Sequence, residues 1–152
     1  MSDLLAPIDQ NTPDLVEVPP PAYASHGFGF DVKCLMANNS SLTITPSQPF
    51  DLESLLQHST LDEAQASALV STLTRRIGLI QGPPGTGKSF TGVALIKVLL
   101  ANMEKISRGL GPIICVCYTN HALDQLLEDL LDNKVRQIIR IARSPSQSVC
   151  SH

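Results

Sequence analysis

The chain has 152 residues, enough for one domain with a hydrophobic core, and 43% of them are hydrophobic and 16% charged, as in ordinary globular proteins. The net charge of −3 is unevenly distributed, because residues 1–63 carry nine acidic and one basic side chain and residues 64–152 carry five acidic and ten basic ones. The C-terminal part therefore favours polyanions as partners, although an ordinary solvated surface has a similar balance.

The sequence does not indicate a metalloprotein or a secreted protein. Its four cysteines are Cys34, Cys115, Cys117 and Cys150. The nearest two form Cys-x-Cys inside an apolar run, which is not a metal-ligand spacing, so we expect reduced thiols. The first residues lack the features of a secretory signal, and the longest apolar run is too short to span a bilayer. We expect an intracellular protein, cytoplasmic or nuclear, without membrane contact.

The N-terminal third changes character twice. Residues 1–26 are rich in proline, acidic and small side chains, a composition that predicts a flexible leader. In residues 27–49 aromatic and β-branched side chains alternate with polar ones on both sides of Asn38–Ser41, which predicts two short strands joined by a turn. Residues 50–58 predict a short helix or an apolar strap.

A helix is predicted from Thr60 to about residue 76. Thr60 and Glu63 have the spacing of a capping box, in which each side chain accepts a hydrogen bond from the other residue's backbone N–H. Apolar side chains at helical spacing predict the buried face. These are Leu61, Ala64, Ala68, Leu69 and Leu73.

The most informative stretch is residues 81–89, Gln-Gly-Pro-Pro-Gly-Thr-Gly-Lys-Ser. It matches Gly-x-x-x-x-Gly-Lys-[Ser/Thr], the loop whose backbone N–H groups cradle the phosphates of a nucleoside triphosphate. The flanking residues fit, because residues 76–81 predict a short buried strand and residues 90–101 a helix. A Gly/Pro loop that merely caps a helix is the alternative.

Each residue type in the loop has a chemical reason. Glycines allow the backbone to approach an anion closely, and the prolines Pro83 and Pro84 restrict the loop before binding. Lys88 reaches the β- and γ-phosphates, and the Ser89 hydroxyl is offered to Mg²⁺. The predicted nucleotide-binding residues of the loop are Gly82, Pro84, Gly85, Thr86, Gly87, Lys88 and Ser89.

Strand and helix signals continue after the loop. The helix 90–101 is apolar on nearly every side and is expected inside a larger body. Residues 113–118 predict a parallel strand, Thr119–Asn120 a helix cap, residues 121–132 a second helix and residues 137–141 a third strand. This alternation predicts an α/β fold with a parallel sheet and flanking helices, that is, a P-loop NTPase.

Three separated segments together resemble the first half of the first RecA-like domain of a superfamily 1 helicase. Residues 61–65 resemble the Q motif, residues 82–89 motif I, and residues 117–126 motif Ia. The last segment is similar in particular to the Upf-like group, and most similar to its branch with NFX-type zinc fingers. The resemblance covers about residues 50–143.

On this resemblance we expect four regions. They are the leader (1–26), a short β segment (27–49), a partial RecA-like domain (50–143) and a Ser-rich tail (144–152).

The resemblance also implies cofactors, partners and roles. ATP and Mg²⁺ are the implied cofactors, Lys88 the catalytic residue, and Gln65 the residue that hydrogen-bonds adenine. Thr119, Asn120 and His121 are implied contacts to the backbone of single-stranded nucleic acid, RNA rather than DNA. Two plainer interpretations stay open: Gln65 as a solvent-facing glutamine, and Thr119–Asn120 as a simple helix cap.

Residues needed for hydrolysis are missing from the pattern. No apolar strand ends in Asp-Glu to hold Mg²⁺, since Glu128–Asp129 falls in a predicted helix and Asp62–Glu63 in a helix cap. We therefore expect a truncated helicase that binds ATP·Mg²⁺ weakly without helicase-like turnover. The alternatives are an AAA-type remodelling ATPase and a non-catalytic nucleotide-binding interaction module.

Overall fold

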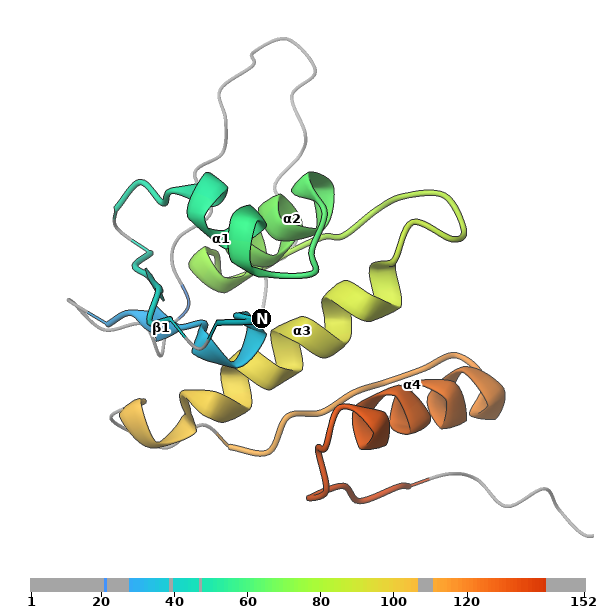
Figure 1. Cartoon of the computed structure of the whole chain (residues 1–152). Coiled ribbons are helices and arrows are strands. Elements are labelled where there is room, and N and C mark those ends of the chain that lie inside the picture. Colours follow the sequence, from blue (N-terminus) through green and yellow to red (C-terminus); the bar gives the residue numbers. More distant parts are fainter. Residues whose placement is uncertain (1–20, 22–27, 39, 47, 107–110, 142–152) are drawn as a thin grey trace, which may run out of the picture.

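The computed structural model describes residues 21, 28–38, 40–46, 48–106 and 111–141. The expected leader, apart from Pro21, and the Ser-rich tail lie outside these residues. In chain order the elements are β1 (Phe30–Asp31), η1 (Lys33–Leu35), β2 (Thr43–Ile44), α1 (Leu52–His58), α2 (Glu63–Thr74), α3 (Lys88–Ala101), η2 (Met103–Lys105) and α4 (Asn120–Asp132). Figure 1 shows α3 in the middle, with α1 and α2 on one side of it and α4 on the other.

The N-terminal β segment forms the predicted pair of short strands. Strands β1 and β2 are antiparallel, with Phe30 opposite Ile44 and Asp31 opposite Thr43. Phe30 and Ile44 are fully buried. The chain then enters α1, so of the two alternatives for this segment the helix forms and not the strap. The helix begins where the Asp51 carboxylate accepts a hydrogen bond from the Glu53 N–H at 3.1 Å.

One core joins the β segment to α1, α2 and α3. Burial of apolar side chains from all of these elements is the main stabilising contribution. Helix α3 contacts α2, α4, η1 and β1, which confirms the expectation that it lies inside a larger body. The core residues are Phe30, Val32, Met36, Ile44, Leu55, Leu61, Ala66, Leu69, Leu73, Ala94 and Val98.

A buried asparagine at the end of α3 ties this helix to β1. Asn102 is fully buried, and its Oδ1 accepts a hydrogen bond from the Asp31 N–H at 2.9 Å. Its Nδ2 donates to the carbonyl oxygens of Asp31 and Val98, each at 2.8 Å. The carboxamide thus pairs with the backbone of β1 much as a neighbouring strand would, while it also caps α3.

The start of α2 differs from the prediction. The N-cap is Asp62 rather than Thr60, and the capping box pairs Asp62 with Gln65: the Gln65 N–H donates to Asp62 Oδ1 at 2.8 Å, and the Asp62 N–H donates to Gln65 Oε1 at 3.2 Å. Two overlapping sets of residues had capping-box spacing, and burial of Leu61 just before the helix favours the later start.

The buried face of α2 shifts slightly with its start. Leu69 and Leu73 are buried as predicted, whereas Ala66 is buried in place of Ala64, which is exposed. The helix ends at Thr74, next to the predicted arginines.

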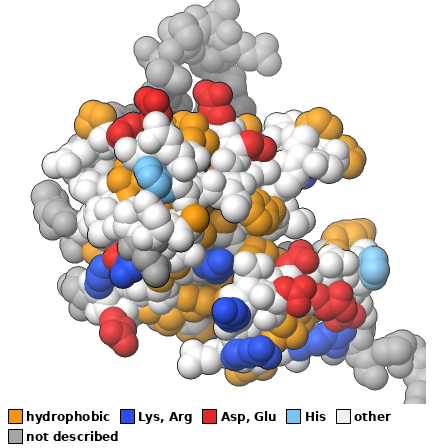
Figure 2. Space-filling view, in the orientation of Figure 1, with side chains coloured by type: hydrophobic (Ala, Val, Ile, Leu, Met, Phe, Trp, Pro, Cys, Tyr) orange, Lys and Arg blue, Asp and Glu red, His pale blue; other side chains and the backbone are white. Residues whose placement is uncertain are grey.

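The predicted parallel sheet is not formed among the described residues, whose one sheet is the β1–β2 pair. Residues 76–81, 113–118 and 137–141 belong to no strand ladder. The side chains of Leu79, Val116 and Ile139 are 88–89% exposed. An apolar run becomes a parallel strand only beside another strand and between two covering layers, and these three runs lack both here. Figure 2 shows hydrophobic side chains at the surface over the connection between α2 and α3.

Among the described residues, no helix combines the length and the apolar composition needed to cross a membrane.

We expect Asn102→Ala to lower the free energy of unfolding by about 2–4 kcal/mol, because the backbone N–H and C=O of Asp31 lose their partner in a half-buried place. Asn38→Ala is the matched control, since Asn38 accepts one hydrogen bond in an exposed turn and its loss should cost less than about 1 kcal/mol. Urea unfolding followed by circular dichroism measures both. Equal losses of unfolding free energy in the two variants would show that Asn102 does not stabilise the contact between α3 and β1.

Candidate nucleotide-binding site

The phosphate loop enters α3 through two left-handed glycines. Gly85 and Gly87 have φ of +84° and +76°, a region that glycine occupies without the steric cost other residues meet. Gly87 is the N-cap of α3, and its carbonyl oxygen accepts from the Thr91 N–H at 2.9 Å. The first N–H groups of α3 therefore face the loop without partners inside the helix, which is the arrangement that binds anions.

The side chain of Gln65, on α2, lies against Gly87. A Cβ at residue 87 would displace the terminal amide nitrogen, Nε2, of this glutamine. The same Nε2 lies 3.5 Å from the Thr86 carbonyl oxygen, and Gln65 Oε1 accepts from the Asp62 N–H. One carboxamide thus links the start of α2 to the phosphate loop.

Lys88, the first residue of α3, folds back over the loop. Its Nζ donates to the carbonyl oxygens of Gly82 at 2.7 Å and Pro83 at 2.6 Å. The Thr86 hydroxyl also donates to the Pro83 carbonyl, at 2.9 Å. Phosphate oxygens would compete with these carbonyls for the ammonium group, and a charged acceptor makes the stronger hydrogen bond.

The residues present fit a magnesium–nucleotide. The loop offers backbone N–H donors at a helix N-terminus and an ammonium group for phosphate, and the exposed Ser89 supplies a hydroxyl oxygen for Mg²⁺. Among the described residues, no group of three or more His, Cys, Asp or Glu side chains could hold a metal ion alone. A divalent ion here would therefore depend on the phosphates and water for most of its ligands.

A broad depression of about 740 Å³, open to solvent, lies between the start of α2 and the loop. Its size is within the range of small-molecule sites. The carboxylates of Asp62 and Glu63 stand on the α2 side, where they disfavour phosphate, so the uncharged part of a nucleotide fits that side better. Of the α2 residues that line the depression, the sequence predicts only Gln65 as a nucleotide contact. The full lining is Asp62, Glu63, Ala64, Gln65, Ser67, Gly85, Thr86 and Gly87.

The predicted nucleic-acid residues stand at the start of α4. The Thr119 hydroxyl oxygen accepts from the Ala122 N–H at 3.1 Å, so Thr119 is the helix cap, as predicted. Asn120 and His121 are exposed in the first turn. In Figure 1 α3 and α4 begin at the same end of the molecule, which places this turn and the phosphate loop at the same end.

Charge limits which part of α4 can meet a polyanion. Its surface carries Asp124, Glu128, Asp129 and Asp132, and Figure 2 shows this acidic group with basic side chains beside it. One of the acids is neutralised, because Arg140 Nε donates to Asp124 Oδ1 at 2.7 Å. A nucleic-acid backbone is therefore repelled along the helix and is best accommodated at its first turn, where the dipole is positive.

The cysteines of the described part of the chain do not line this site. They are Cys34, Cys115 and Cys117, which are free thiols, as expected. Burial raises the pKa of the Cys115 thiol, and the neighbouring Cys117 raises it further, so this thiol is less reactive than an exposed one.

The loop, its lysine and the helix that follows define the class of protein: a nucleotide-binding domain of the P-loop, α/β type. Residues 60–151 match the AAA domain family, and the chain belongs to that family.

Comparison with curated proteins shows which members of the family the chain is similar to. The chain is 47% identical over 90 residues to the human NFX1-type zinc finger-containing protein 1, a match that covers 57% of this chain and 5% of that protein. It is 40% identical over 100 residues to the helicase required for RNAi-mediated heterochromatin assembly 1 of Schizosaccharomyces pombe (66% and 9%). It is 29% identical over 106 residues to the ATP-dependent helicase upf1 of the same yeast (70% and 11%).

These matches confirm the similarity to Upf-like superfamily 1 helicases. The chain spans about a tenth or less of the length of these three relatives. No solved structure matches it.

We expect Gly87→Ala to weaken nucleotide binding at least tenfold, or about 1.4 kcal/mol, because an alanine at this left-handed position strains the backbone of the loop. Gly92→Ala, inside α3, is the control, since nothing lies within 4 Å of a Cβ there and alanine is the better helix former. Titration with a fluorescent ATP analogue measures both. Similar affinities in the two variants would contradict the role given to the left-handed backbone.

Proposed function

We propose that this chain is the ATP-binding part of an ATP-dependent nucleic-acid helicase that acts on RNA rather than DNA. The observation that carries the proposal is that α3 and α4 begin at the same end of the molecule. The glycine-rich loop and Lys88 lead into α3, and a turn capped by Thr119 starts α4. Two of the relatives are named helicases, and one of these is named ATP-dependent.

The proposed roles follow the chemistry of each group. The backbone N–H groups of residues 82–89 bind the phosphates, Lys88 neutralises the charge that develops on the γ-phosphate, and Ser89 holds Mg²⁺. Gln65 is proposed to hydrogen-bond adenine. Because Nε2 and Oε1 of Gln65 already contact Thr86 and Asp62, adenine would have to share or replace those contacts.

The proposed nucleic-acid contacts are Thr119, Asn120 and His121. The Thr119 hydroxyl oxygen is used as a cap acceptor, so its proton stays free to donate to a phosphate oxygen. Asn120 adds an amide donor and His121 a ring donor from the exposed turn. Such contacts recognise a backbone rather than a base sequence.

The regions expected from the sequence remain part of the proposal. We propose that residues 50–143 form a partial RecA-like domain in which 76–81, 113–118 and 137–141 align as a parallel sheet. Three helices that pack as α2, α3 and α4 do, with apolar extended runs between them, support that arrangement.

An AAA-type remodelling ATPase is the second candidate, because the loop sequence and the family description suit it. The helicase names of two relatives and the Thr119–Gln125 segment favour the helicase. Stimulation of ATP hydrolysis by single-stranded RNA in the full-length protein separates the two. Stimulation by a protein substrate, without an effect of RNA, would favour the remodelling ATPase.

We expect Lys88→Ala to weaken ATP·Mg²⁺ binding at least tenfold, since an ammonium–phosphate contact is worth more than about 1.4 kcal/mol. Lys105→Ala removes the same charge far from the loop and should leave the affinity unchanged. Titration with a fluorescent ATP analogue compares them. Equal binding by Lys88→Ala and the unmodified chain would contradict the assignment of the loop.

Turnover tests the rest of the site. We expect the chain to release no phosphate at a helicase-like rate, because no apolar strand ends in an acid to hold Mg²⁺, and the described residues include no group of three or more His, Cys, Asp or Glu side chains that could hold a metal ion. A coupled phosphate assay with and without oligouridylate measures this. Several turnovers per second, abolished by Lys88→Ala, would show that the chain completes its own catalytic site.

A further inference from the structure

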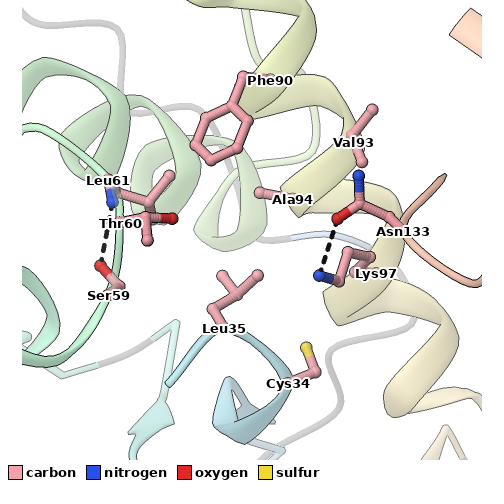
Figure 3. A pocket seen from close by; sticks show the side chains of 10 residues that line it. All are labelled: Cys34, Leu35, Ser59, Thr60, Leu61, Phe90, Val93, Ala94, Lys97 and Asn133. Atoms are coloured by element: carbon pink, nitrogen blue, oxygen red, sulfur yellow. Dashed lines mark hydrogen bonds between the residues drawn. The ribbon is translucent and has the colours of Figure 1, made fainter. Parts of the chain in front are cut away.

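Helices α3 and α4 are linked by one polar contact that the nucleotide and nucleic-acid sites do not explain. Lys97, on α3, donates from Nζ to Oδ1 of Asn133 at 3.1 Å, and Asn133 is the C-cap of α4. Figure 3 shows the two side chains facing each other from the two helices. Lys97 lies nine residues after Lys88, so about 14 Å of helix separates it from the phosphate loop.

The acceptor in this contact is held in place. Asn133 Nδ2 donates to the Asp129 carbonyl oxygen at 2.8 Å, which turns Oδ1 toward Lys97. The chain then leaves α4 with Lys134 in a left-handed conformation, φ 66°, and with the Val135 N–H donating to the Leu130 carbonyl oxygen at 3.0 Å. The end of α4 is therefore fixed by its own backbone, and Asn133 presents a defined acceptor.

Helix α4 packs on α3, with Leu130 buried and Leu123, Leu126 and Leu127 half-buried. The hydrogen bond from the Lys97 ammonium group, in a half-buried place, adds a directional contact to this apolar packing.

There is also space beside the contact. A cavity of about 90 Å³ lies next to Lys97 and Asn133, and Figure 3 shows Leu35, Phe90 and Val93 around it. No carboxylate lines this cavity. No acid there competes for the Lys97 ammonium group, and Asn133 is the acceptor that it contacts.

We propose that Lys97 and Asn133 form a brace through which α3 positions α4, so that ATP in the phosphate loop changes the affinity of the Thr119–His121 turn for single-stranded RNA. The inference rests on the proposed function. Lys88 Nζ donates to the carbonyls of Gly82 and Pro83, so a phosphate that takes over this ammonium group would alter the contacts at the first turn of α3. With the brace intact, a shift of α3 also shifts α4. Without the brace, nucleotide binding no longer alters the RNA affinity of the first turn of α4.

The quantity to measure is the ratio of two dissociation constants. Fluorescence anisotropy of a labelled oligouridylate gives its Kd with and without a non-hydrolysable ATP analogue and Mg²⁺. In the unmodified chain we expect the ratio to differ from one by about fivefold or more. Lys97→Met and Asn133→Ala should each bring it to within about twofold of one, and the double variant should go no further.

Two variants control for charge and folding. Lys97→Arg keeps the cationic donor, so the ratio of the two Kd values should stay close to that of the unmodified chain. Lys105→Met removes one positive charge from the short helix after α3, where Lys105 pairs with Asp31 at 3.5 Å, and should alter both Kd values equally. A purely structural effect of Lys97→Met would weaken nucleotide binding as well, and titration with a fluorescent ATP analogue detects that. If Lys97→Met does not fold, Asn133→Ala and Lys97→Arg decide the question.

The possible failures are distinguishable. Absence of nucleotide or RNA binding by the unmodified chain overturns the proposed function, and this inference with it. Binding of both ligands with a ratio of one, or with a ratio that Lys97→Met and Asn133→Ala leave unchanged, overturns the brace alone.

Discussion

The structure depends on the burial of α3. This helix is apolar on nearly every side, so it is stable only when other elements cover it. The β segment, with η1, and α2 cover part of it, and α4 covers another part. Because α3 also begins with the phosphate-loop lysine, the packing that satisfies its apolar surface is the same packing that positions Lys88. The same contacts therefore stabilise the fold and position the nucleotide site.

Polar side chains determine how the covering elements are oriented. Apolar contacts are not directional, whereas Asn102 and Lys97 each make hydrogen bonds that only one arrangement satisfies. Asn102 fixes the end of α3 on β1, and Gln65 fixes the start of α2 on the loop. The hydrophobic core therefore holds the elements together, and a few amides set their register.

How much the sequence predicts depends on whether the signal is local. The loop, the Thr119 cap and the helices α2, α3 and α4 follow from glycine positions, capping residues and apolar spacing. For α1 the sequence leaves a short helix and an apolar strap as alternatives. The start of α2 was misplaced because Thr60 and Asp62 both begin a capping box, and only the burial of Leu61 decides between them. The contacts of Asn102 and Lys97 span 71 and 36 residues, and no local pattern indicates a partner at that distance.

The prediction of parallel strands is wrong for the described residues, for a related reason. Residues 76–81, 113–118 and 137–141 have the right composition, but a strand is a property of its neighbours as well as of its own residues. The phosphate loop is well formed even though the run before it has no ladder, because the loop is held from the helical side by Gln65, Lys88 and the left-handed glycines. The groups proposed to bind the phosphates all lie on this helical side of the loop. Hydrolysis also needs an acid at the end of a neighbouring strand, so it depends on the sheet that these three runs do not form here.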